Sequence, residues 1–358
     1  MRIDRLRETM ASNDATSMLV TDITNIRYLT GFTGSSAALL VTDKDALIIS
    51  DGRYGEQLRQ QCPDIEADIR PMTETLFDYT AARLKDRCPR ETFFEHGAIS
   101  LKHFNQLQES YSGELKRGGD WIEDLRAVKD ESEIQLIRKS IELNQTVFQS
   151  VIGNLSPNTT EKEIAAEIEY QGRRLGADGC SFEPIVAVGP NSALAHYRPG
   201  DVKIGDGDFT LIDWGLNYKG YASDLTRMVL TSKTPSKLAE IYDVTLAGQQ
   251  AAIEMLKPGI DTKAVDAAAR EVIAAAGFGD QFNHGLGHGI GLNIHEGPRL
   301  SPSLDNILQT GMVVTVEPGI YLAGFGGVRL EDDVLITEDG YEVLSNLPKE
   351  RKLCVVPL

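Results

Sequence analysis

The N-terminal third of the chain alternates short apolar runs with amphipathic stretches. The runs at residues 17–21 and 37–42 are rich in residues that favour strands, and a third run at 46–50 follows a polar turn, which predicts a hairpin. Apolar positions at helical spacing over residues 76–86 predict a helix. We therefore expect a small α/β domain over residues 1–125.

Long amphipathic helices replace this pattern from residue 126 onward. Apolar residues recur at helical spacing from Glu131 to Asn154, which predicts one long helix. Thr160 and Glu163 have the spacing of a capping box, in which each side chain bonds the backbone of the other residue. A second helix should therefore begin there and run through Leu175.

The order of elements then repeats. The first two helices precede an apolar, Gly-rich stretch at 182–189 and a hairpin; two further helices, predicted at 236–257 and 262–277, precede another Gly-rich stretch and another hairpin. We interpret this as an internal duplication of structure. The expected fold class is α+β, with a second domain over residues 126–358 whose halves face each other across one cleft.

Each predicted hairpin carries a pair of acidic residues. Asp213 and Asp224 flank the turn at residues 217–220 at equal distances from its centre, and Glu317 and Glu331 flank a Gly-rich turn in the same way. In an antiparallel hairpin, residues so placed lie directly opposite each other on one face, with Cβ atoms roughly 5 Å apart. The pattern predicts two close pairs of carboxylates.

Such pairs favour a cation. A single acid on a strand is usually solvated, but these four lie in apolar strands, where an uncompensated charge is costly. Like charges at this distance destabilise the fold unless one carboxylate is protonated or a cation bridges the two. The four acids therefore predict a site for two divalent ions.

The composition limits the class of protein. A chain of 358 residues is long for one hydrophobic core, which favours two domains. The net charge of −17 argues against nucleic acid or an anionic membrane as a partner, because both require a basic face. The N-terminus lacks the apolar segment of a secretory signal, no apolar run approaches the ~18 residues of a membrane span, and the four cysteines are scattered. We expect a cytoplasmic protein.

Three of the six histidines, His284, His288 and His295, lie in one Gly-rich stretch. The alternating glycines predict an extended chain with His284, Leu286 and His288 on one face and the glycines on the other, where a backbone or a ligand approaches closely. The His284/His288 spacing does not indicate a helical zinc-protease motif, because no glutamate stands between the histidines and glycines break the helix. Carboxylates with one imidazole form a hard, oxygen-rich ligand set that favours manganese, iron(II) or cobalt.

Several short motifs carry a family resemblance. Most of them lie in the C-terminal domain, and two more, Tyr28-Leu-Thr-Gly-Phe-Thr-Gly34 and Asp51-Gly-Arg-Tyr54, lie near the N-terminus. The C-terminal motifs are Asp213-Trp-Gly215, Ser223-Asp-Leu-Thr-Arg227, His284-Gly-Leu-Gly-His-Gly-Ile-Gly291, His295-Glu-Gly-Pro298, Val316-Glu-Pro-Gly319 and Val328-Arg-Leu-Glu-Asp332.

Together these motifs resemble the pita-bread metallopeptidases, and within them the proline-specific branch of aminopeptidase P and prolidase. The resemblance covers nearly the whole chain. It implies a creatinase/prolidase-like N-terminal domain over 1–125 and a pita-bread catalytic domain over 126–358. It also implies a homodimer.

The resemblance implies a ligand set for two ions. Asp213, Asp224 and Glu331 would hold one ion, and Asp224, His288, Glu317 and Glu331 would hold the other, so that Asp224 and Glu331 bridge. Glu317 would also act as the base for the nucleophilic water. Mn²⁺ is the expected metal, with Co²⁺, Fe²⁺ and Zn²⁺ as alternatives.

Five further residues would contact the substrate or support the metal ligands. The resemblance implies that His196 and His295 position the scissile amide and stabilise the oxyanion, and that His284 lines the pocket. Arg329, two residues before Glu331 on the same strand face, is placed to support the carboxylates from behind. Arg299 could meet a substrate carboxylate, or it could be a loop residue only.

The predicted function is an Xaa-Pro aminopeptidase, which hydrolyses the bond between an N-terminal residue and proline. The two N-terminal motifs favour this activity, whereas Arg299 favours the alternative, an Xaa-Pro dipeptidase (prolidase). Methionine aminopeptidases typically lack such an N-terminal domain. Creatinase-like amidinohydrolases and non-catalytic binding modules on the same fold lack metal ligands, so the complete ligand set argues against both.

Overall fold

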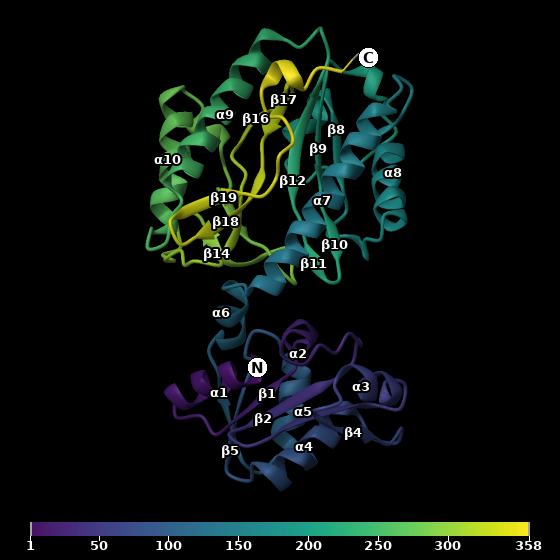
Figure 1. Ribbon diagram of the computed structural model, residues 1–358, viewed down its shortest axis with the longest axis vertical. Coiled ribbons are helices and arrows are strands. Elements are labelled where there is room, and N and C mark those ends of the chain that lie inside the picture. The colour runs from purple at the N-terminus through teal and green to yellow at the C-terminus, as the bar shows by residue number, and fades with distance from the viewer. Residues whose placement is uncertain (1, 357–358) are drawn as a thin grey trace. The chain divides into compact units, whose positions relative to one another are not determined.

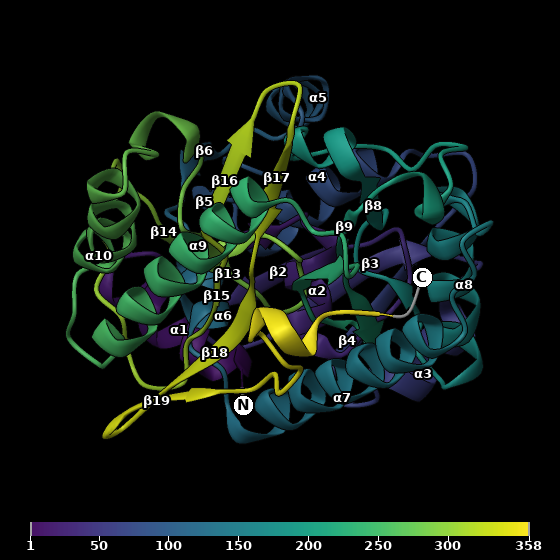
Figure 2. The same cartoon turned by 90° about the horizontal axis from the view of Figure 1, so that it is seen from above.

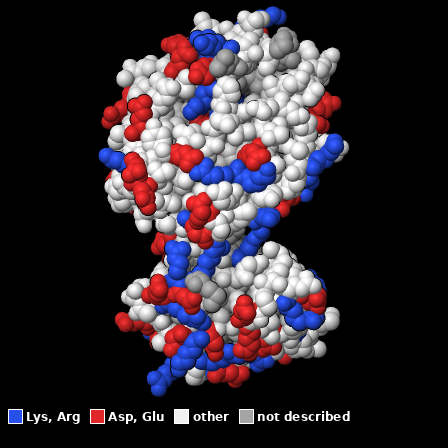
Figure 3. Space-filling view, in the orientation of Figure 1, with Lys and Arg blue, Asp and Glu red and all other residues white. Residues whose placement is uncertain are grey.

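The computed structural model describes residues 2–356 and divides into two compact units, Met1–Arg126 and Ala127–Leu358. Figure 1 shows the helices and strands of both units. None of the helices in the described range combines the length and the apolar character needed to cross a membrane. On the face shown in Figure 3, acidic and basic side chains lie interspersed over each unit.

The N-terminal unit is built on a six-stranded mixed sheet of order β4-β3-β2-β1-β5-β6. The predicted hairpin is confirmed, since β2 and β3 pair antiparallel, and the predicted helix at 76–86 is confirmed as α4. Strands β4 to β6 and five of the helices were not predicted. The elements are α1 (Arg2–Ser12), β1 (Ser17–Val20), α2 (Ile23–Thr30), β2 (Ala38–Thr42), β3 (Ala46–Asp51), α3 (Gly55–Gln61), β4 (Glu66–Arg70), α4 (Leu76–Arg87), β5 (Glu91–Phe94), α5 (Leu101–Ser110), β6 (Glu114–Arg117) and α6 (Trp121–Ala127).

A buried carboxylate, Glu95, accepts hydrogen bonds from residues around the start of α2. Its Oε2 accepts hydrogen bonds from the backbone N–H of Thr21 (2.6 Å) and of Asp22 (2.8 Å), and its Oε1 accepts one from the Asn25 side chain (2.6 Å). Burial raises the pKa of Glu95 to about 7, although these hydrogen bonds oppose the shift.

This raised pKa makes the stability of the N-terminal unit depend on pH. Below pH 4.5 the carboxyl group is protonated in both the folded and unfolded states, so its contribution is fully present; between pH 4.5 and 7 only the unfolded state ionises, and the contribution is lost. We expect the free energy of unfolding to fall by about 3 kcal/mol across this range. Glu95→Gln, whose carbonyl can still accept both backbone N–H groups, should remove the dependence. Urea unfolding at several pH values, followed by Trp121 fluorescence in a Trp214→Phe background, measures this free energy. If the free energy of unfolding of the Gln variant still falls between pH 4.5 and 7 as it does in the parent protein, Glu95 is not the cause.

The C-terminal unit contains four long helices whose bounds agree with the predicted ones within two residues at each end. The capping box of Thr160 and Glu163 is confirmed at the start of the second helix. Figure 1 shows α7 and α8 on one side of the strands and α9 and α10 on the other. The helices are α7 (Glu131–Gly153), α8 (Glu161–Arg174), α9 (Ser236–Met255) and α10 (Thr262–Ala275).

The strands of this unit repeat, which confirms the predicted duplication of structure. In the first half β8, β9 and β12 form an antiparallel sheet, and in the second half β13, β15 and β18 do the same, with β14 and β19 added at the edges. The strands are β7 (Gly179–Cys180), β8 (Ile185–Val188), β9 (Phe209–Trp214), β10 (Leu216–Tyr218), β11 (Tyr221–Ala222), β12 (Leu225–Leu230), β13 (Gly287–Gly289), β14 (Glu296–Leu300), β15 (Val313–Val316), β16 (Gly319–Leu322), β17 (Gly326–Arg329), β18 (Asp332–Thr337) and β19 (Gly340–Val343).

Both faces of the first-half sheet are buried. Ile212 and Trp214 belong to a core shared with α7 and α8, whereas their neighbour Leu211 belongs to a second core shared with α9 and α10. Helix α9 packs against β15, β16 and β17, and Figure 2 shows it beside the β16–β17 hairpin. Burial on both faces explains why these strands are mostly apolar.

The two hairpins have different registers relative to their acids. The register of β15 with β18 and of β16 with β17 places Glu317 opposite Glu331, which confirms the predicted pairing. The prediction of direct opposition is wrong for Asp213, whose partner is Thr226.

The turn explains this difference. The chain reverses at Lys219-Gly220, both of which have positive φ (49° and 85°), as a two-residue hairpin turn requires. The centre of the turn is therefore one residue further along the chain than the centre predicted from symmetry. Asp213 and Asp224 become diagonal neighbours on the same face, so they still point to one site.

Candidate metal centre

One cavity of about 950 Å³ in the C-terminal unit collects the candidate residues. Its lining comes from both hairpins, from the loop that follows β8, and from the Gly-rich stretch around β13. All ten residues expected at the site from the sequence line it: Asp213, Asp224, His288, Glu317, Glu331, His196, His284, His295, Arg299 and Arg329.

The centre of the cavity has the geometry of a metal site. Single ligand atoms of Asp224, His288 and Glu331 all lie within 4.8 Å of one another, and all three side chains are buried. The Nε2 atom of His288 lies 3.2 Å from Oε1 of Glu317 and 3.6 Å from Oδ2 of Asp224. Four of the five expected ligands therefore converge around the His288 ring.

Asp213, the fifth expected ligand, is held beside this group by Arg329. The Arg329 guanidinium forms an ion pair with Oδ2 of Asp213 and donates to the Thr226 hydroxyl (3.1 Å). The other oxygen, Oδ1 of Asp213, is buried and has no hydrogen-bond partner among the described residues. A buried carboxylate oxygen without a donor is costly, and a cation would compensate it.

The carboxylates interact strongly. Burial raises the pKa of Asp224 well above its usual value, and the neighbouring carboxylates of Glu331 and Asp213 reinforce this effect. Burial, with the charges of Glu317 and Asp213, likewise raises the pKa of Glu331. For Glu317 burial is outweighed by the hydrogen bond and charge of His288, which lower its pKa to about 2. Without a cation, the site cannot ionise all its acids at neutral pH without a large cost.

Two threonines that the sequence reasoning missed orient the ligands. The Thr226 hydroxyl donates to Oε2 of Glu331 (2.7 Å), and the Thr315 hydroxyl lies 3.2 Å from Oε1 of Glu317. The backbone N–H of His288 also donates to Thr315 (3.1 Å). Thr226 stands two residues after Asp224, and Thr315 stands two residues before Glu317, so period-two spacing could have found both threonines.

Tyr321 was also missed. Its hydroxyl accepts a hydrogen bond from Arg329 (2.7 Å) and lies 3.2 Å from Nε2 of His284. Burial lowers the pKa of His284, which keeps its ring neutral. Tyr321 thus connects the arginine that holds Asp213 to a histidine of the cavity wall, and no sequence pattern singles it out.

The substrate-side residues lie around this centre. His295 packs edge to face on His288, with ring centroids 4.4 Å apart, and burial followed by the charge of His288 lowers its pKa to about 4. His196 lies on the loop after β8. The Arg299 guanidinium forms no hydrogen bond or ion pair within the described part of the chain, so it is available to an anion.

Glycines allow β13 to pass between two neighbouring strands, as the sequence predicts. A Cβ at Gly287 would lie 2.0 Å from the Thr315 carbonyl oxygen, and one at Gly289 would lie 2.1 Å from that of Gly297. The expected common face for His284, Leu286 and His288 is not found: Leu286 is in the core, and only the histidines line the cavity. The reason is that the strand is short and begins at Gly287.

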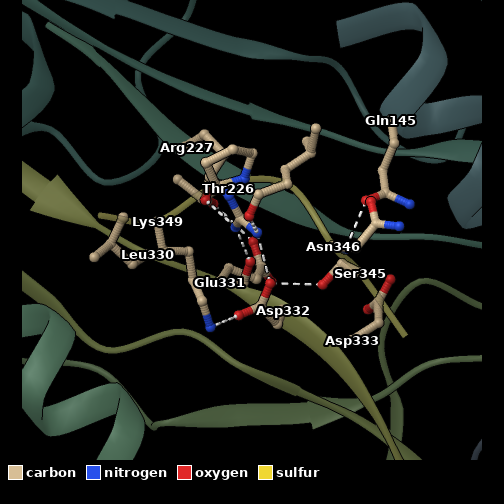
Figure 4. Close-up of polar contacts among 12 residues, drawn as sticks. Gln145, Thr226, Arg227, Leu330, Glu331, Asp332, Asp333, Ser345, Asn346 and Lys349 are labelled. Atoms are coloured by element: carbon tan, nitrogen blue, oxygen red, sulfur yellow. Dashed lines mark hydrogen bonds and ion pairs between the residues drawn. The ribbon is translucent and has the colours of Figure 1, made fainter. Parts of the chain in front are cut away.

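A buried ion pair between Arg227 and Asp332 joins the two halves of the C-terminal unit next to the metal ligands. The guanidinium of Arg227 donates to the backbone carbonyls of Thr226 and Glu331 and lies 2.6 Å from Oδ1 of Asp332. Lys349 pairs with the other oxygen of Asp332 (Figure 4). Because Thr226 and Glu331 belong to different hairpins, this pair fixes the distance between them.

The donor set fits hard divalent ions. Four carboxylates and one imidazole surround the cavity centre, and free cysteines lie elsewhere in the chain. Oxygen-rich sites with a single histidine suit Mn²⁺ and similar ions better than thiolate-bound zinc. Residues from both halves would thus be needed to bind the metal.

Comparisons with known proteins agree with this geometry. A family model described as "Metallopeptidase family M24" matches residues 135–338, and a "Creatinase/Prolidase N-terminal domain" model matches residues 2–128. The chain is 35% identical to the Xaa-Pro dipeptidase of Pyrococcus furiosus, over 98% of this chain and 99% of that protein.

Solved structures give a similar result. A structure titled as an Xaa-Pro dipeptidase from Bacillus anthracis superposes with a TM-score of 0.94 at 35% identity, covering 99% of both chains. The X-Pro aminopeptidase from Thermotoga maritima MSB8 gives a TM-score of 0.88 at 35% identity, covering 98% of this chain and 99% of that one.

Proposed function

The chain belongs to metallopeptidase family M24, and we propose that it is an Xaa-Pro dipeptidase that uses two divalent metal ions. The observation that carries the proposal is the convergence of five hard ligands and three histidines on one cavity. We propose Mn²⁺ as the metal, because the ligands are mostly carboxylates.

Asp213, Asp224, His288, Glu317 and Glu331 would hold the ions. When bound, such ions lower the pKa of water and polarise a carbonyl group, which is the chemistry that peptide hydrolysis needs. Glu317 lies at the edge of the ligand group, where its carboxylate can take the proton of the attacking water. His196 and His295 face the same cavity and can donate hydrogen bonds to the scissile amide and its developing oxyanion.

The dipeptidase activity is preferred over the aminopeptidase activity that the sequence favoured. Two of the three relatives above are named dipeptidases, which supports the alternative reading better. Arg299 adds support, because an unpaired guanidinium in the cavity wall can bind the C-terminal carboxylate of a dipeptide. A longer peptide has no carboxylate at that point.

Substrate length tests this choice. We expect the Mn²⁺-loaded protein to hydrolyse an Xaa-Pro dipeptide at least about tenfold faster, by kcat/KM, than the tetrapeptide Xaa-Pro-Yaa-Zaa, because only the dipeptide places a charge at Arg299. Arg299→Ala should raise KM for the dipeptide and leave the tetrapeptide unaffected. Equal rates on both substrates would favour the aminopeptidase.

Metal dependence tests the class. Activity should be lost after chelation and return with added Mn²⁺, whereas a metal-free, inert protein would favour a binding module on this fold. The complete ligand set also supports a peptidase over an amidinohydrolase. The homodimer and the cytoplasmic location expected from the sequence stay predictions.

A further inference from the structure

The loop that carries His196 has little regular structure of its own. It runs from Val188, at the end of β8, to Gly200 and contains one short 3-10 turn, Gly189–Ala193. The side chain of His196 is exposed to the cavity. Some other part of the unit must therefore fix the position of its imidazole.

A single buried carboxylate, Glu161, accepts hydrogen bonds from both ends of this loop. It is the first residue of α8 and is completely inaccessible to solvent. Its Oε1 accepts hydrogen bonds from the backbone N–H of Val188 (2.8 Å) and the Asn191 side chain (2.9 Å). Its Oε2 accepts hydrogen bonds from the Tyr197 hydroxyl (2.9 Å) and the backbone N–H of Gly200 (2.8 Å).

The distribution of these four bonds is informative. One oxygen holds the start of the loop and the other holds its end, so both sides of His196 are fixed by one rigid planar group. Burial and the Glu161 charge raise the pKa of Tyr197 to about 12, so its hydroxyl remains a donor at every physiological pH. A side chain that only caps a helix accepts a hydrogen bond through one oxygen, whereas both oxygens of Glu161 accept hydrogen bonds from the loop.

The second half of the unit has a corresponding arrangement. Asp266, on α10, is buried and forms a bidentate pair with Arg270, with both N–O distances at 2.9 Å. Asp266 also accepts from the backbone N–H of Leu286 (3.1 Å), and Arg270 donates to the carbonyl of His284 (2.9 Å). In each half, an acid on the second helix fixes a segment that carries a cavity histidine.

We propose that Glu161 is a positioning residue that acts through His196, by holding the 188–200 loop so that the imidazole faces the reacting amide. The proposal rests on the role of His196 in the proposed peptidase reaction. Glu161 itself would contact neither substrate nor metal. Its effect on catalysis would therefore depend on the presence of His196.

A double-mutant cycle tests this dependence. We expect Glu161→Gln to lower kcat/KM for an Xaa-Pro dipeptide by roughly 10–100-fold, mainly through kcat, as partners of active-site groups commonly do. In a His196→Ala background the same change should cost less than about threefold, because the group that it positions is gone. Equal effects in both backgrounds would overturn the proposal.

Matched variants separate positioning from general damage. Glu163→Gln, in the same helix turn but exposed, should leave activity unchanged. Tyr197→Phe removes one of the four bonds with less risk to folding, and its smaller loss should also disappear in the His196→Ala background. Bound metal per chain should be equal in all variants; a Glu161→Gln protein that lost metal would overturn the proposal.

A spectroscopic measurement keeps this test independent of the peptidase activity. The ring nitrogen resonances of the six histidines can be recorded on the metal-free full chain, with His196 assigned by its loss in His196→Ala. Glu161→Gln should shift or broaden the His196 signal and leave the His288 signal in place. If the wild-type chain fails to cleave Xaa-Pro but this shift is seen, the proposed function fails and the positioning role stands; an unmoved His196 signal overturns the role.

Discussion

Replacing Asp224 by Asn is expected to lower kcat/KM for an Xaa-Pro dipeptide by roughly 10³-fold or more, and at the same time to stabilise the metal-free protein. The loss of activity follows from geometry. Asp224 lies 3.6 Å from Nε2 of His288 and belongs to the close group with Glu331, so it would be among the residues that hold the metal ions. An amide offers a neutral oxygen in place of a charged carboxylate and would hold divalent cations much less tightly.

The gain in stability follows from electrostatics. Burial and the nearby carboxylates raise the pKa of Asp224 in the folded protein. A carboxyl group with a raised folded pKa contributes stability below its unfolded pKa and loses that contribution as pH rises through the folded value. At pH 8 the aspartate therefore destabilises the metal-free fold, and the neutral Asn removes that cost.

Differential scanning calorimetry after exhaustive chelation checks the second effect. The melting temperature of the C-terminal unit should be higher in the Asp224→Asn protein at pH 8, and the difference should shrink towards pH 4. Added Mn²⁺ should raise the melting temperature of the wild type and leave that of the variant nearly unchanged. A variant less stable than the metal-free wild type would contradict the argument.

The largest stability loss is expected at Asp332. Its carboxylate is completely buried and accepts hydrogen bonds from Arg227, Lys349, Ser345 and Gln249. Asp332→Asn would leave the Arg227 guanidinium, 2% exposed, without an anion. Breaking a buried pair in this way costs about 3–5 kcal/mol, which corresponds to a fall in melting temperature of roughly 10 °C.

An exposed pair provides the control for this second prediction. Arg138 and Glu342 form a bidentate contact at 2.6 Å, but their side chains are 33% and 45% exposed. Glu342→Gln should therefore cost less than about 1 kcal/mol. Trp214 fluorescence in a Trp121→Phe background follows the C-terminal unit alone; equal losses in the two variants would show that burial of Arg227 has no special importance.

The sequence predicted most of the C-terminal unit because its signals are local. Capping residues and apolar spacing located the long helices, and the turns around Gly220 and Gly324 located both hairpins. The N-terminal unit was harder. Strand β4 (Glu66–Arg70) is mostly polar and partly exposed, so its place at the sheet edge depends on pairing with β3 and has no signature of its own.

The site was predicted in its residues but not in all of its geometry. Sequence symmetry placed Asp213 opposite Asp224, whereas the turn at Lys219-Gly220 shifts the register and makes them diagonal. Thr226, Thr315 and Tyr321 were missed because hydroxyl side chains near acids are common, and only the fold reveals which of them face a ligand. Glu161 is more than 30 residues from His196 along the chain, so tertiary structure alone connects them.

The separation of the ligands along the chain has a consequence for biosynthesis. Asp213 and Asp224 lie on the first hairpin and Glu331 on the second, over 100 residues later, and the backbone N–H of Glu331 meets the carbonyl of Thr226 (3.3 Å) only when both halves are docked. A nascent chain therefore cannot assemble the site until the second hairpin has been synthesised and has docked on the first half. We expect metal to bind only after both halves have folded together, so that metal binding reports the docking of the two halves.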